Sequence, residues 1–462
     1  MSKAYFVILH QKTSIMKIGF DNEKYQKIQS EHIKERISQF DGKLYLELGG
    51  KLFDDHHASR VLPGFMPDSK LRMFQKLSDS IEIVIVISAT DIEKNKKRAD
   101  LGITYDEDVL RLRGEFQNRG FMVGSVVITH YNGQPAATAF RQRLEREGIK
   151  TYYHYLIEGY PHNVSLIASD EGFGKNDYVE TERPLVIVTA PGPGSGKMAV
   201  CLSQLYNENK RGVRAGYAKF ETFPVWNLPL KHPVNIAYEA ATADLNDVNM
   251  IDPFHLEAYN KIAINYNRDI EIFPVLNALF EGIYGSNPYK SPTDMGVNMV
   301  GFCISDDEAC CEASKNEIVR RYYAATNKMA CGACNEHEIA KIQLLFNQAK
   351  ITTDFRRTTV AAKNFKKETG HTSAAIELED GTIITAKSSE LLGCSAALLL
   401  NVMKHLAGID HDLKLIPQSM IEPIQHTKIS YLGGRNPRLH TDEVLVALSV
   451  LSVHDDNCHR AL

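Results

Sequence analysis

The sequence is 462 residues long, which is enough for two or three domains with hydrophobic cores of their own. Its formal net charge of −4 gives no electrostatic reason to expect a nucleic-acid partner or an anionic membrane surface. No apolar run reaches the roughly 18 residues of a membrane-spanning helix, and the first residues do not have the pattern of a signal peptide. We therefore expect a cytoplasmic protein that binds neither nucleic acid nor membranes.

The chain contains eight cysteines. Cys201 and Cys303 lie in apolar runs, as reduced thiols in the core of a cytosolic protein do. Cys331 and Cys334 have C-x-x-C spacing, with Cys310–Cys311 upstream. A zinc site would need a second pair at matching spacing, and a redox site would need a thioredoxin-like setting. Structural cysteines are therefore favoured, with a metal site as the alternative.

Strands and helices alternate over residues 16–252. Residues 1–15 are interpreted as a non-native or disordered extension, because the segment from Met16 reads like the beginning of a protein. The predicted helices cover 23–40, 69–77, 106–119 and 136–148, and the predicted strands cover 43–53, 81–88, 124–129, 150–157, 185–190 and 216–223. This order predicts an N-terminal α/β domain over 16–252, with a mainly parallel sheet covered by helices on both faces.

The pattern changes in the second half of the chain. Residues 253–350 are helical in pattern with almost no strand signal, and we interpret them as a helical insertion or a helical middle domain. Further on, A-A-I-E-L-E-D-G-T-I-I-T-A predicts a hairpin with its turn at Asp380-Gly381. Helices are predicted over 394–408 and 438–453. Residues 351–462 are thus expected to form a smaller C-terminal α/β domain.

A P-loop-like glycine turn is the central feature of the N-terminal domain. The strand over 185–190 leads into P-G-P-G-S-G and then into Lys197, which opens an amphipathic segment. A strand, a glycine turn and a helix in this order direct free backbone N–H groups and the positive end of a helix dipole toward an anion. The residues expected to hold a phosphate are Gly192, Gly194, Ser195, Gly196 and Lys197.

This turn departs from the Walker A motif G-x-x-x-x-G-K-[ST] at two positions. Pro191 stands where the first glycine should be, and Met198 stands where a serine or threonine would ligate Mg²⁺. Binding of a nucleotide with Mg²⁺, or of another phosphorylated small molecule, is therefore better supported than nucleotide hydrolysis. The alternative is a tight turn without a ligand.

A second glycine–lysine turn, S-D-E-G-F-G-K-N, precedes the first one. Gly174 and Lys175 are expected to add a second phosphate contact or to form a lid over the same cleft. An ordinary exposed polar turn is the alternative.

The run D-D-H-H-A-S-R at 54–60 directly follows a predicted strand. Ligand sites in open α/β sheets lie beyond the carboxyl ends of the strands. We expect Asp55 and His56 to share acid–base work there, with Arg60 holding an anionic group. A metal site and a solvated loop are the alternatives.

Two further polar groups of residues follow the last strand of this domain. A polar, proline-rich segment resembles a binding wall, unless its tryptophan, the only one in the chain, is a core anchor. The residues of this predicted wall are Lys219, Glu221, Trp226, Asn227, Lys231, His232 and Asn235. Downstream, Asp244 and Asp247 are expected to supply the Mg²⁺ ligands that the glycine turn lacks, unless they only cap the next helix.

Four segments resemble a known bacterial family: L-Y-L-E-L-G-G-K-L-F-D-D-H-H-A-S-R-V-L-P-G-F, T-A-P-G-P-G-S-G-K-M, Y-A-K-F-E-T-F-P-V-W-N-L-P-L-K-H-P-V-N and A-A-T-A-D-L-N-D-V-N-M-I-D-P-F-H. The family is domain-of-unknown-function family eighteen forty-six, also called uncharacterised protein family three seventy-one. The resemblance covers nearly the whole chain from Met16. It implies a soluble, multidomain α/β protein with a helical subdomain and no assigned activity. Family members usually start after residue 15 and continue beyond the tail of this chain.

These features predict an enzyme that acts on a small phosphorylated ligand, as a phosphoryl- or acyl-group transferase or a ligase. Arg435 and Arg438 are candidates to reach a neighbouring subunit or a substrate anion, and we expect a homo-oligomer. The alternative is a non-catalytic protein that binds a phosphate ligand or serves in assembly. The two alternatives differ in how many polar side chains share one cleft with the glycine turn.

Overall fold

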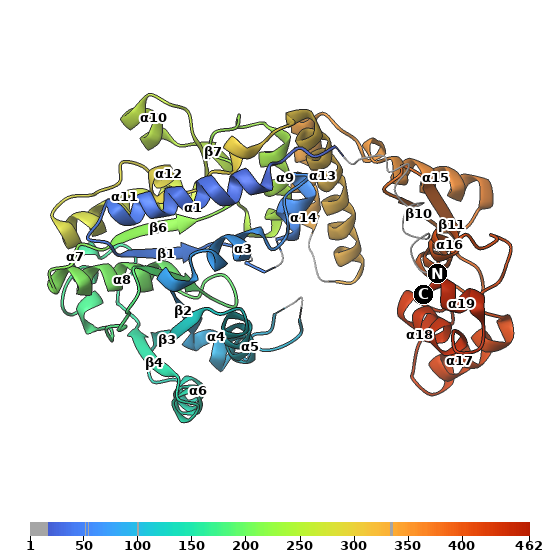
Figure 1. The fold of residues 1–462 in the computed structure, drawn as a ribbon, viewed down its shortest axis with the longest axis horizontal. Coiled ribbons are helices and arrows are strands. Elements are labelled where there is room, and N and C mark those ends of the chain that lie inside the picture. Colours follow the sequence, from blue (N-terminus) through green and yellow to red (C-terminus); the bar gives the residue numbers. More distant parts are fainter. Residues whose placement is uncertain (1–16, 51, 54, 99–100, 333–335) are drawn as a thin grey trace, which may run out of the picture. The chain divides into compact units, whose positions relative to one another are not determined.

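The computed structural model describes residues 17–50, 52–53, 55–98, 101–332 and 336–462 (Figure 1). The chain forms two compact units, one spanning Ile18–Ala349 and the other containing Lys350–Leu462. The first unit holds every strand predicted before residue 252 and the glycine turn, so it carries the candidate site.

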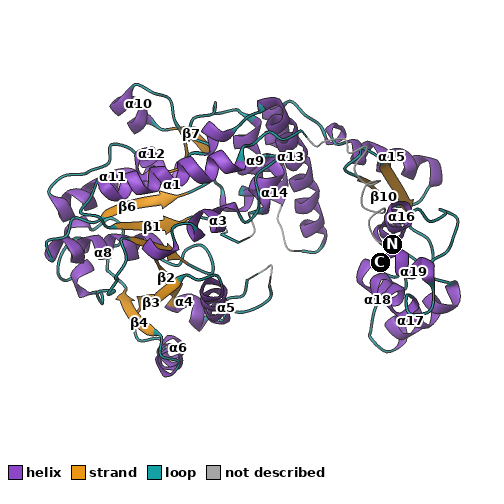
Figure 2. Cartoon of the chain, viewed as in Figure 1, coloured by secondary structure: helices purple, strands orange, loops and turns teal. Residues whose placement is uncertain are grey.

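Seven parallel strands form the sheet of the first unit, in the order β4-β3-β2-β5-β1-β6-β9. Their bounds are β1 Leu44–Leu48, β2 Ile81–Ser88, β3 Met122–Tyr131, β4 Lys150–Tyr155, β5 Leu185–Thr189, β6 Gly216–Phe220 and β9 Gly296–Val297. β5 is buried along its whole length between β1 and β2, which explains its uninterrupted apolar run. The expected α/β class is confirmed (Figure 2).

Helices cover both faces of this sheet. Alternate residues of β2 point to opposite faces, so Ile85 packs in one core and Val86 in the other. The helices over the first core are α1 (Asn22–Ser38), α3 (Ser69–Gln75), α4 (Ala89–Glu93), α5 (Tyr105–Asn118) and α6 (Pro135–Arg146). The helices over the second core are α7 (Val164–Ile167), α8 (Lys197–Lys210) and α11 (Asn267–Tyr284).

The connections that leave β1 and β5 run in opposite directions across the sheet. β1 connects past β5 to β2, and β3 and β4 then extend the sheet to one edge. β5 connects past β1 to β6, and β9 completes the other edge. In open α/β sheets, ligands bind outside the carboxyl ends of strands whose connections diverge in this way. The glycine turn follows β5 directly and therefore lies at this position.

Residues 253–349 belong to the same compact unit as the sheet, whereas the sequence suggested a separate helical middle domain. β9 is the edge strand beside β6, and α11 packs in a core of the sheet. The strands β7 (Asn249–Ile251), β8 (Ile264–Tyr266) and β9 are too short to give a periodic signal. The other helices of the unit are α2 (His56–Val61), α9 (Pro233–Ala241), α10 (Pro253–Tyr259), α12 (Pro292–Met295), α13 (Asp307–Ala330) and α14 (Glu336–Ala349).

The second unit is built around a hairpin. β10 (Ser373–Glu377) pairs antiparallel with β11 (Ile383–Lys387), and Gly381 in the turn has φ +83°, a conformation that favours glycine. The hairpin predicted at Asp380-Gly381 is therefore confirmed. The helices of this unit are α15 (Arg357–Thr369), α16 (Cys394–Leu406), α17 (Gln418–Ser430), α18 (Thr441–Leu451) and α19 (Asp456–Ala461).

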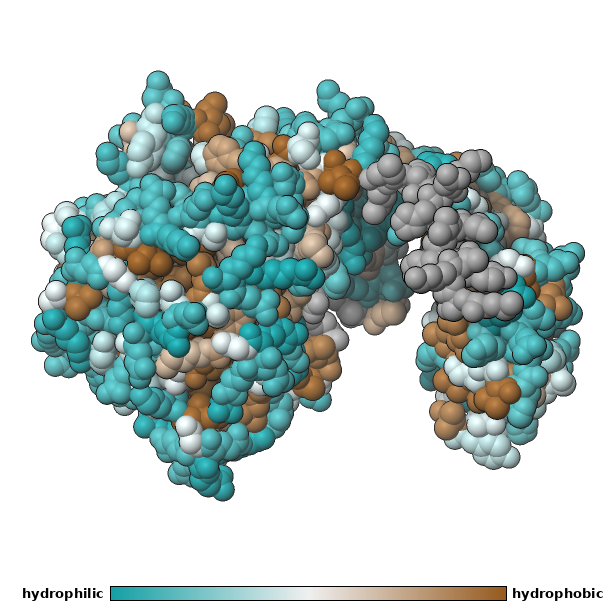
Figure 3. All heavy atoms as spheres, in the orientation of Figure 1, coloured by the Kyte–Doolittle hydropathy of each residue, from teal (hydrophilic) through white to brown (hydrophobic). Residues whose placement is uncertain are grey.

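The surface of the molecule is mainly polar. The face shown in Figure 3 is mostly hydrophilic, with apolar side chains scattered over it, as is normal for a surface in contact with water. Within the described residues, every helix is too short or too polar to cross a membrane.

Candidate functional site

The glycine turn joins β5 to α8 through residues in left-handed conformations. Gly196, directly before α8, has φ +87°, and Gly194 has φ +74°, values that favour glycine. A Cβ on Gly196 would lie 3.2 Å from Thr129 Oγ1 at the end of β3. The Thr129 hydroxyl also donates a 2.6 Å hydrogen bond to the Ser195 carbonyl. These contacts hold the amino terminus of α8 close to the strand ends.

Two polar groups of the turn have no partner among the described residues. Ser195 is 2% exposed, and its buried Oγ makes no hydrogen bond. Lys197, half-buried at the first position of α8, forms no hydrogen bond or ion pair within the described part of the chain. Buried hydroxyl groups normally have a partner, and a helix amino terminus attracts negative charge. The turn therefore has the donors that an anion would need.

Gly192 is covered by protein. A Cβ on Gly192 would come within 2.3 Å of Tyr105 Oη, and Tyr105 itself is buried. Gly194, in contrast, is exposed and has no atom within 4 Å of an added Cβ. The accessible side of the turn thus runs from Gly194 to Lys197, and the complete wrap of a Walker A loop around a phosphate is not confirmed.

The second glycine turn lies further along α8. The Phe173 carbonyl in the 3₁₀ turn that contains Gly174 and Lys175 accepts a 3.2 Å hydrogen bond from Ser203 Oγ. Ser203 is six positions beyond Lys197, which corresponds to about 9 Å along a helix axis. The structure therefore places Gly174 and Lys175 beside the middle of α8 and not at its amino terminus.

Asp55 takes part in an internal ion pair. Its carboxylate lies 2.7 Å from Nζ of Lys70, which is 1% exposed, and accepts a 3.0 Å hydrogen bond from the Ala58 N–H, which caps α2. Burial acts to raise the pKa of Asp55, but Lys70 and the backbone donor outweigh it and lower the pKa. These contacts are sufficient to explain the residue as a structural one.

His56 and Arg60 are both exposed on α2. The buried histidine of this run is His57, whose Nδ1 lies 3.7 Å from Glu317 Oε1 of α13. No hydrogen bond or ion pair between described residues connects Asp55, His56 or Arg60 with the glycine turn, and Asp54 lies outside the described residues. The catalytic roles assigned to this run stay predictions.

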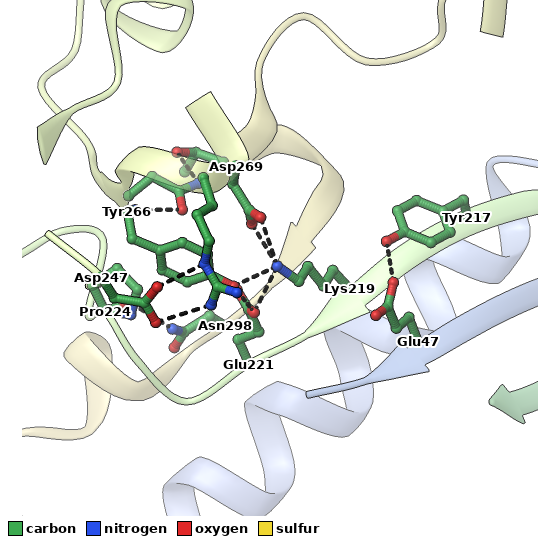
Figure 4. Close-up of polar contacts among 12 residues, drawn as sticks. Glu47, Tyr217, Lys219, Glu221, Pro224, Asp247, Tyr266, Asp269 and Asn298 are labelled. Atoms are coloured by element: carbon green, nitrogen blue, oxygen red, sulfur yellow. Dashed lines mark hydrogen bonds and ion pairs between the residues drawn. The ribbon is translucent and has the colours of Figure 1, made fainter. Parts of the chain in front are cut away.

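Asp244 and Asp247 have different surroundings. Asp247 is 1% exposed, and Arg268 binds its carboxylate with nitrogen–oxygen distances of 2.6 and 2.9 Å (Figure 4). Asp244 is exposed in a 3₁₀ turn over Ala243–Leu245. Burial raises the pKa of Asp247 even though Arg268 opposes it. Because an arginine already compensates Asp247, we have no geometric support for the predicted Mg²⁺ site.

A group of candidate metal ligands lies between α9 and α13. His232, Asp307 and Cys311 bring one ligand atom each within 4.8 Å of one another. His232 Nδ1 accepts a 3.3 Å hydrogen bond from a backbone N–H, so Nε2 carries the proton and donates it to Asp307 Oδ1 at 2.9 Å. His232 and Asp307 are thus already hydrogen-bonded to each other, and a metal ion bound at Nε2 would have to displace the proton on this nitrogen. Of the C-x-x-C pair, Cys331 is exposed and Cys334 lies outside the described residues.

A buried polar cluster surrounds Lys219 at the carboxyl end of β6 (Figure 4). Lys219 Nζ lies 2.8 and 2.6 Å from the two carboxylate oxygens of Asp269 on α11, and 2.8 Å from Glu221 Oε1. The Tyr266 hydroxyl accepts a hydrogen bond from Lys219 and donates one to Glu221. One ammonium group is therefore enclosed by two carboxylates and a phenol.

The environment of this cluster changes the pKa of its members. Burial raises the pKa of Glu221 to about 7, although Lys219 opposes the shift. Burial acts to lower the pKa of Lys219, but Asp269 and Glu221 outweigh it and raise the pKa well above its usual value. A carboxyl group that titrates near pH 7 is suited to accept and release a proton in catalysis.

Glu47 lies beside Lys219 in the sheet. Glu47 is on β1, between β5 and β6, and its register partner on β6 is Lys219. It is buried and accepts a 2.8 Å hydrogen bond from the Tyr217 hydroxyl (Figure 4). Burial raises the pKa of the Cys201 thiol on α8, Glu47 adds to the increase, and Lys197 opposes it. The carboxylate of Glu47 therefore influences groups on both α8 and β6.

A cavity of about 200 Å³ opens beside the Lys219 cluster. Lys219, Glu221 and Trp226, which the sequence grouped as a binding wall, all line it. The indole Nε1 donates a 2.8 Å hydrogen bond to the Asn298 carbonyl, which fixes the ring in the wall. The other lining residues are His32, Arg36, Pro224, His255, Ile264, Asn265, Asp269, Pro292, Thr293, Asp294, Gly296, Asn298 and Met299.

The pH dependence of stability is expected to report on Glu221. Its folded-state pKa of about 7 lies above the ordinary value of 4.5, so between these values the folded protein holds a proton that the unfolded chain has lost. The free energy of unfolding of the wild type, relative to Glu221→Gln, should therefore fall as the pH rises from about 4.5 to 7. Urea unfolding of both proteins across this range measures the difference, and a constant difference would contradict it.

Several members of the site had no recognisable signal in the sequence. Tyr266 and Asp269 lie some fifty residues after Lys219, in a segment that was interpreted as helical. His255 and Arg36 come from α10 and α1. One hint was available, because Asp269 is an acidic residue in a mainly apolar helix, and such residues are usually paired.

The fold and the site define a two-unit α/β protein with a parallel sheet and a polar cavity at the carboxyl ends of its strands. Residues 18–350 match the family described as "Domain of unknown function DUF1846, N-terminal", and residues 354–462 match "Domain of unknown function DUF1846, C-terminal". The chain belongs to this family, as the resemblance of its sequence predicted.

Relatives with known sequences extend over almost the whole chain. The UPF0371 protein cu0538 of Corynebacterium urealyticum is 58% identical over 446 residues, which is 96% of this chain and 90% of that protein. The UPF0371 protein str1377 of Streptococcus thermophilus is 57% identical with the same coverage. Among solved structures, the ORC2 protein of Aeropyrum pernix in its ADP form aligns with 93% of this chain and 84% of its own, at 9% identity and a TM-score of 0.17. This score is too low to support any inference.

Proposed function

We propose that this protein is an enzyme that binds a nucleotide or another phosphorylated small molecule, with the phosphate at Gly194–Lys197. The proposal rests on Lys197 and the buried Ser195 hydroxyl, two positions apart in the turn, neither of which has a hydrogen-bond or ion-pair partner among the described residues. Both lie at the amino terminus of a 14-residue helix that follows the central strand of the sheet. This position combines a full positive charge, a helix dipole and free donors.

The reaction that fits this arrangement is transfer or ligation of a phosphoryl or acyl group. Such reactions need an electrophile bound by positive charge and a nearby group that takes up a proton. Lys197 and the amino terminus of α8 would supply the positive charge that binds the electrophile. Glu221, which follows β6 two strands along the sheet from β5, would supply the proton acceptor, because burial raises its pKa to about 7.

A non-catalytic phosphate-binding protein is the second candidate. It is favoured by two observations, namely the Tyr105 ring against Gly192 and the exposure of His56 and Arg60. Both reduce the number of groups that surround a phosphate on the turn.

A melting-temperature screen tests the proposal. Inorganic phosphate, ADP and ATP would each be added to the whole protein with and without Mg²⁺. A ligand at a concentration 100 times its Kd stabilises the folded state by about 2.7 kcal/mol, so a bound phosphate compound should raise the Tm measurably. A Tm unchanged by all three would refute the proposal, while binding without turnover of any compound would favour the second candidate.

A further inference from the structure

Arg36 is a buried arginine that lacks a carboxylate partner among the described residues. It lies in the last turn of α1, is 7% exposed and lines the cavity beside Lys219. One guanidinium nitrogen donates a 2.8 Å hydrogen bond to the Asp294 carbonyl, and the group lies 5.7 Å from the centre of the Tyr289 ring. Its Nε is buried and makes no hydrogen bond. The full positive charge is therefore held out of water by neutral groups, namely the Asp294 carbonyl and the side chain of Tyr289, whose hydroxyl also interacts with Arg36.

A buried arginine without a carboxylate partner, such as Arg36, is unusual, because buried charges in proteins are normally paired. The arginines of another cavity of this unit show the usual arrangement. Arg72, Arg111 and Arg119 line a cavity of about 620 Å³, and each forms an ion pair with an aspartate or glutamate. An arginine that lines a cavity and has no carboxylate partner is suited to bind an anionic ligand.

The carboxylates that line the cavity with Arg36 are already engaged. Asp269 and Glu221 bind Lys219. Asp294 accepts hydrogen bonds from the Tyr259 hydroxyl, at 3.0 Å, and from a backbone N–H, at 3.1 Å. None of these carboxylates forms an ion pair with the Arg36 guanidinium in the described structure, so the positive charge at this end of the cavity is open to a ligand.

We infer that this cavity binds a small anionic molecule whose carboxylate or phosphate group pairs with Arg36. The volume of about 200 Å³ exceeds that of an engineered cavity of about 150 Å³ that holds benzene, so a molecule of a few carbon atoms fits. Trp226 and His255 supply a ring-lined wall, and Lys219 and Glu221 form the end where polar groups of the ligand would be recognised. The inference is independent of the phosphate proposed at Gly194–Lys197.

The test measures binding of two probes, succinate and inorganic phosphate, to the whole protein by calorimetry and by Tm. At least one probe should bind to the wild type and raise its Tm. Arg36→Met should weaken that binding at least about 10-fold, since a charge-assisted hydrogen bond is lost, and Arg36→Lys should restore part of it. Arg72→Met removes an exposed, ion-paired arginine and should bind like the wild type.

The stability of Arg36→Met without any probe separates a binding role from a structural one. Removal of an unpaired buried charge should leave the Tm within about 3 °C of the wild type or raise it. A fall of more than about 10 °C would identify Arg36 as a structural residue and overturn the inference. Absence of binding by both probes at about 10 mM would also overturn the inference. A phosphate response that Lys197→Ala abolishes and Arg36→Met leaves intact would overturn it as well if succinate does not bind.

Discussion

Replacement of Lys219 by methionine is expected to destabilise the sheet unit by about 3–5 kcal/mol. Lys219 pairs with the carboxylates of both Glu221 and Asp269. Without it, the two carboxyl groups lie close together in a partly buried site, with only the Tyr266 hydroxyl as a donor among the contacts described above. At pH 8 the folded protein must then keep two like charges together or bind a proton that the unfolded chain has lost. Methionine fills a similar volume, so the loss reports on charge compensation more than on packing.

Urea unfolding at pH 8, followed by the fluorescence of Trp226, measures this loss. Trp226 is the only tryptophan of the chain and lines the same cavity, so its signal reports on the sheet unit. The matched control is Lys150→Ala, which breaks the exposed ion pair with Glu180 and should cost less than about 1 kcal/mol. Equal losses in the two variants would show that the cluster does not depend on Lys219.

Replacement of Lys197 by alanine is expected to weaken binding of the phosphate ligand by about 10- to 100-fold and to leave the unliganded fold intact. The loss corresponds to one charge-assisted hydrogen bond of about 1.5–3 kcal/mol. Stability should hardly change, because Lys197 makes no hydrogen bond or ion pair within the described residues. Calorimetric titration with the phosphate compound that raises the Tm of the wild type gives the Kd directly.

Lys175→Ala is the matched control for this experiment. Lys175 is the lysine of the second glycine turn, and its Nζ lies 5.8 Å from the centre of the Tyr155 ring. That turn packs beside the middle of α8, so its lysine should not contribute to binding at the helix start. If Lys175→Ala and Lys197→Ala lose equal affinity, the phosphate is not located at Gly194–Lys197.

The sequence was a good guide to the sheet. β2 and β5 were predicted within one residue of their observed bounds, because strands buried on both faces are rich in β-branched and other apolar residues. Within β2, only Glu82 and the last residue, Ser88, are polar. β9 was not predicted, since two residues give no pattern. This omission is also why residues 253–349 were taken for a separate domain.

The candidate site was predicted only in part. Of the seven residues predicted as a binding wall, Lys219, Glu221 and Trp226 line a cavity, because polar and aromatic residues after a strand lie at the carboxyl edge of the sheet. The cavity lining does not include Asn227, Lys231, His232 and Asn235. The polar run at 54–60 follows a strand in the same way, but Asp55 pairs with Lys70 in the interior. A residue's position directly after a strand therefore predicts the edge of the sheet at which the residue lies, but it does not predict which residue its side chain contacts.

Local chemistry was enough to establish that glycines precede α8 and that a lysine begins it, because backbone conformation and helix polarity depend on neighbouring residues. Only the folded chain brings Arg36 and Asp269 to the cavity beside Lys219. There Lys219 pairs with Asp269, whereas Arg36 has no carboxylate partner among the described residues. Whether a charged side chain is compensated depends on how close an opposite charge lies in space. Residues more than 200 positions apart in the chain come close enough to interact only when the sheet has formed.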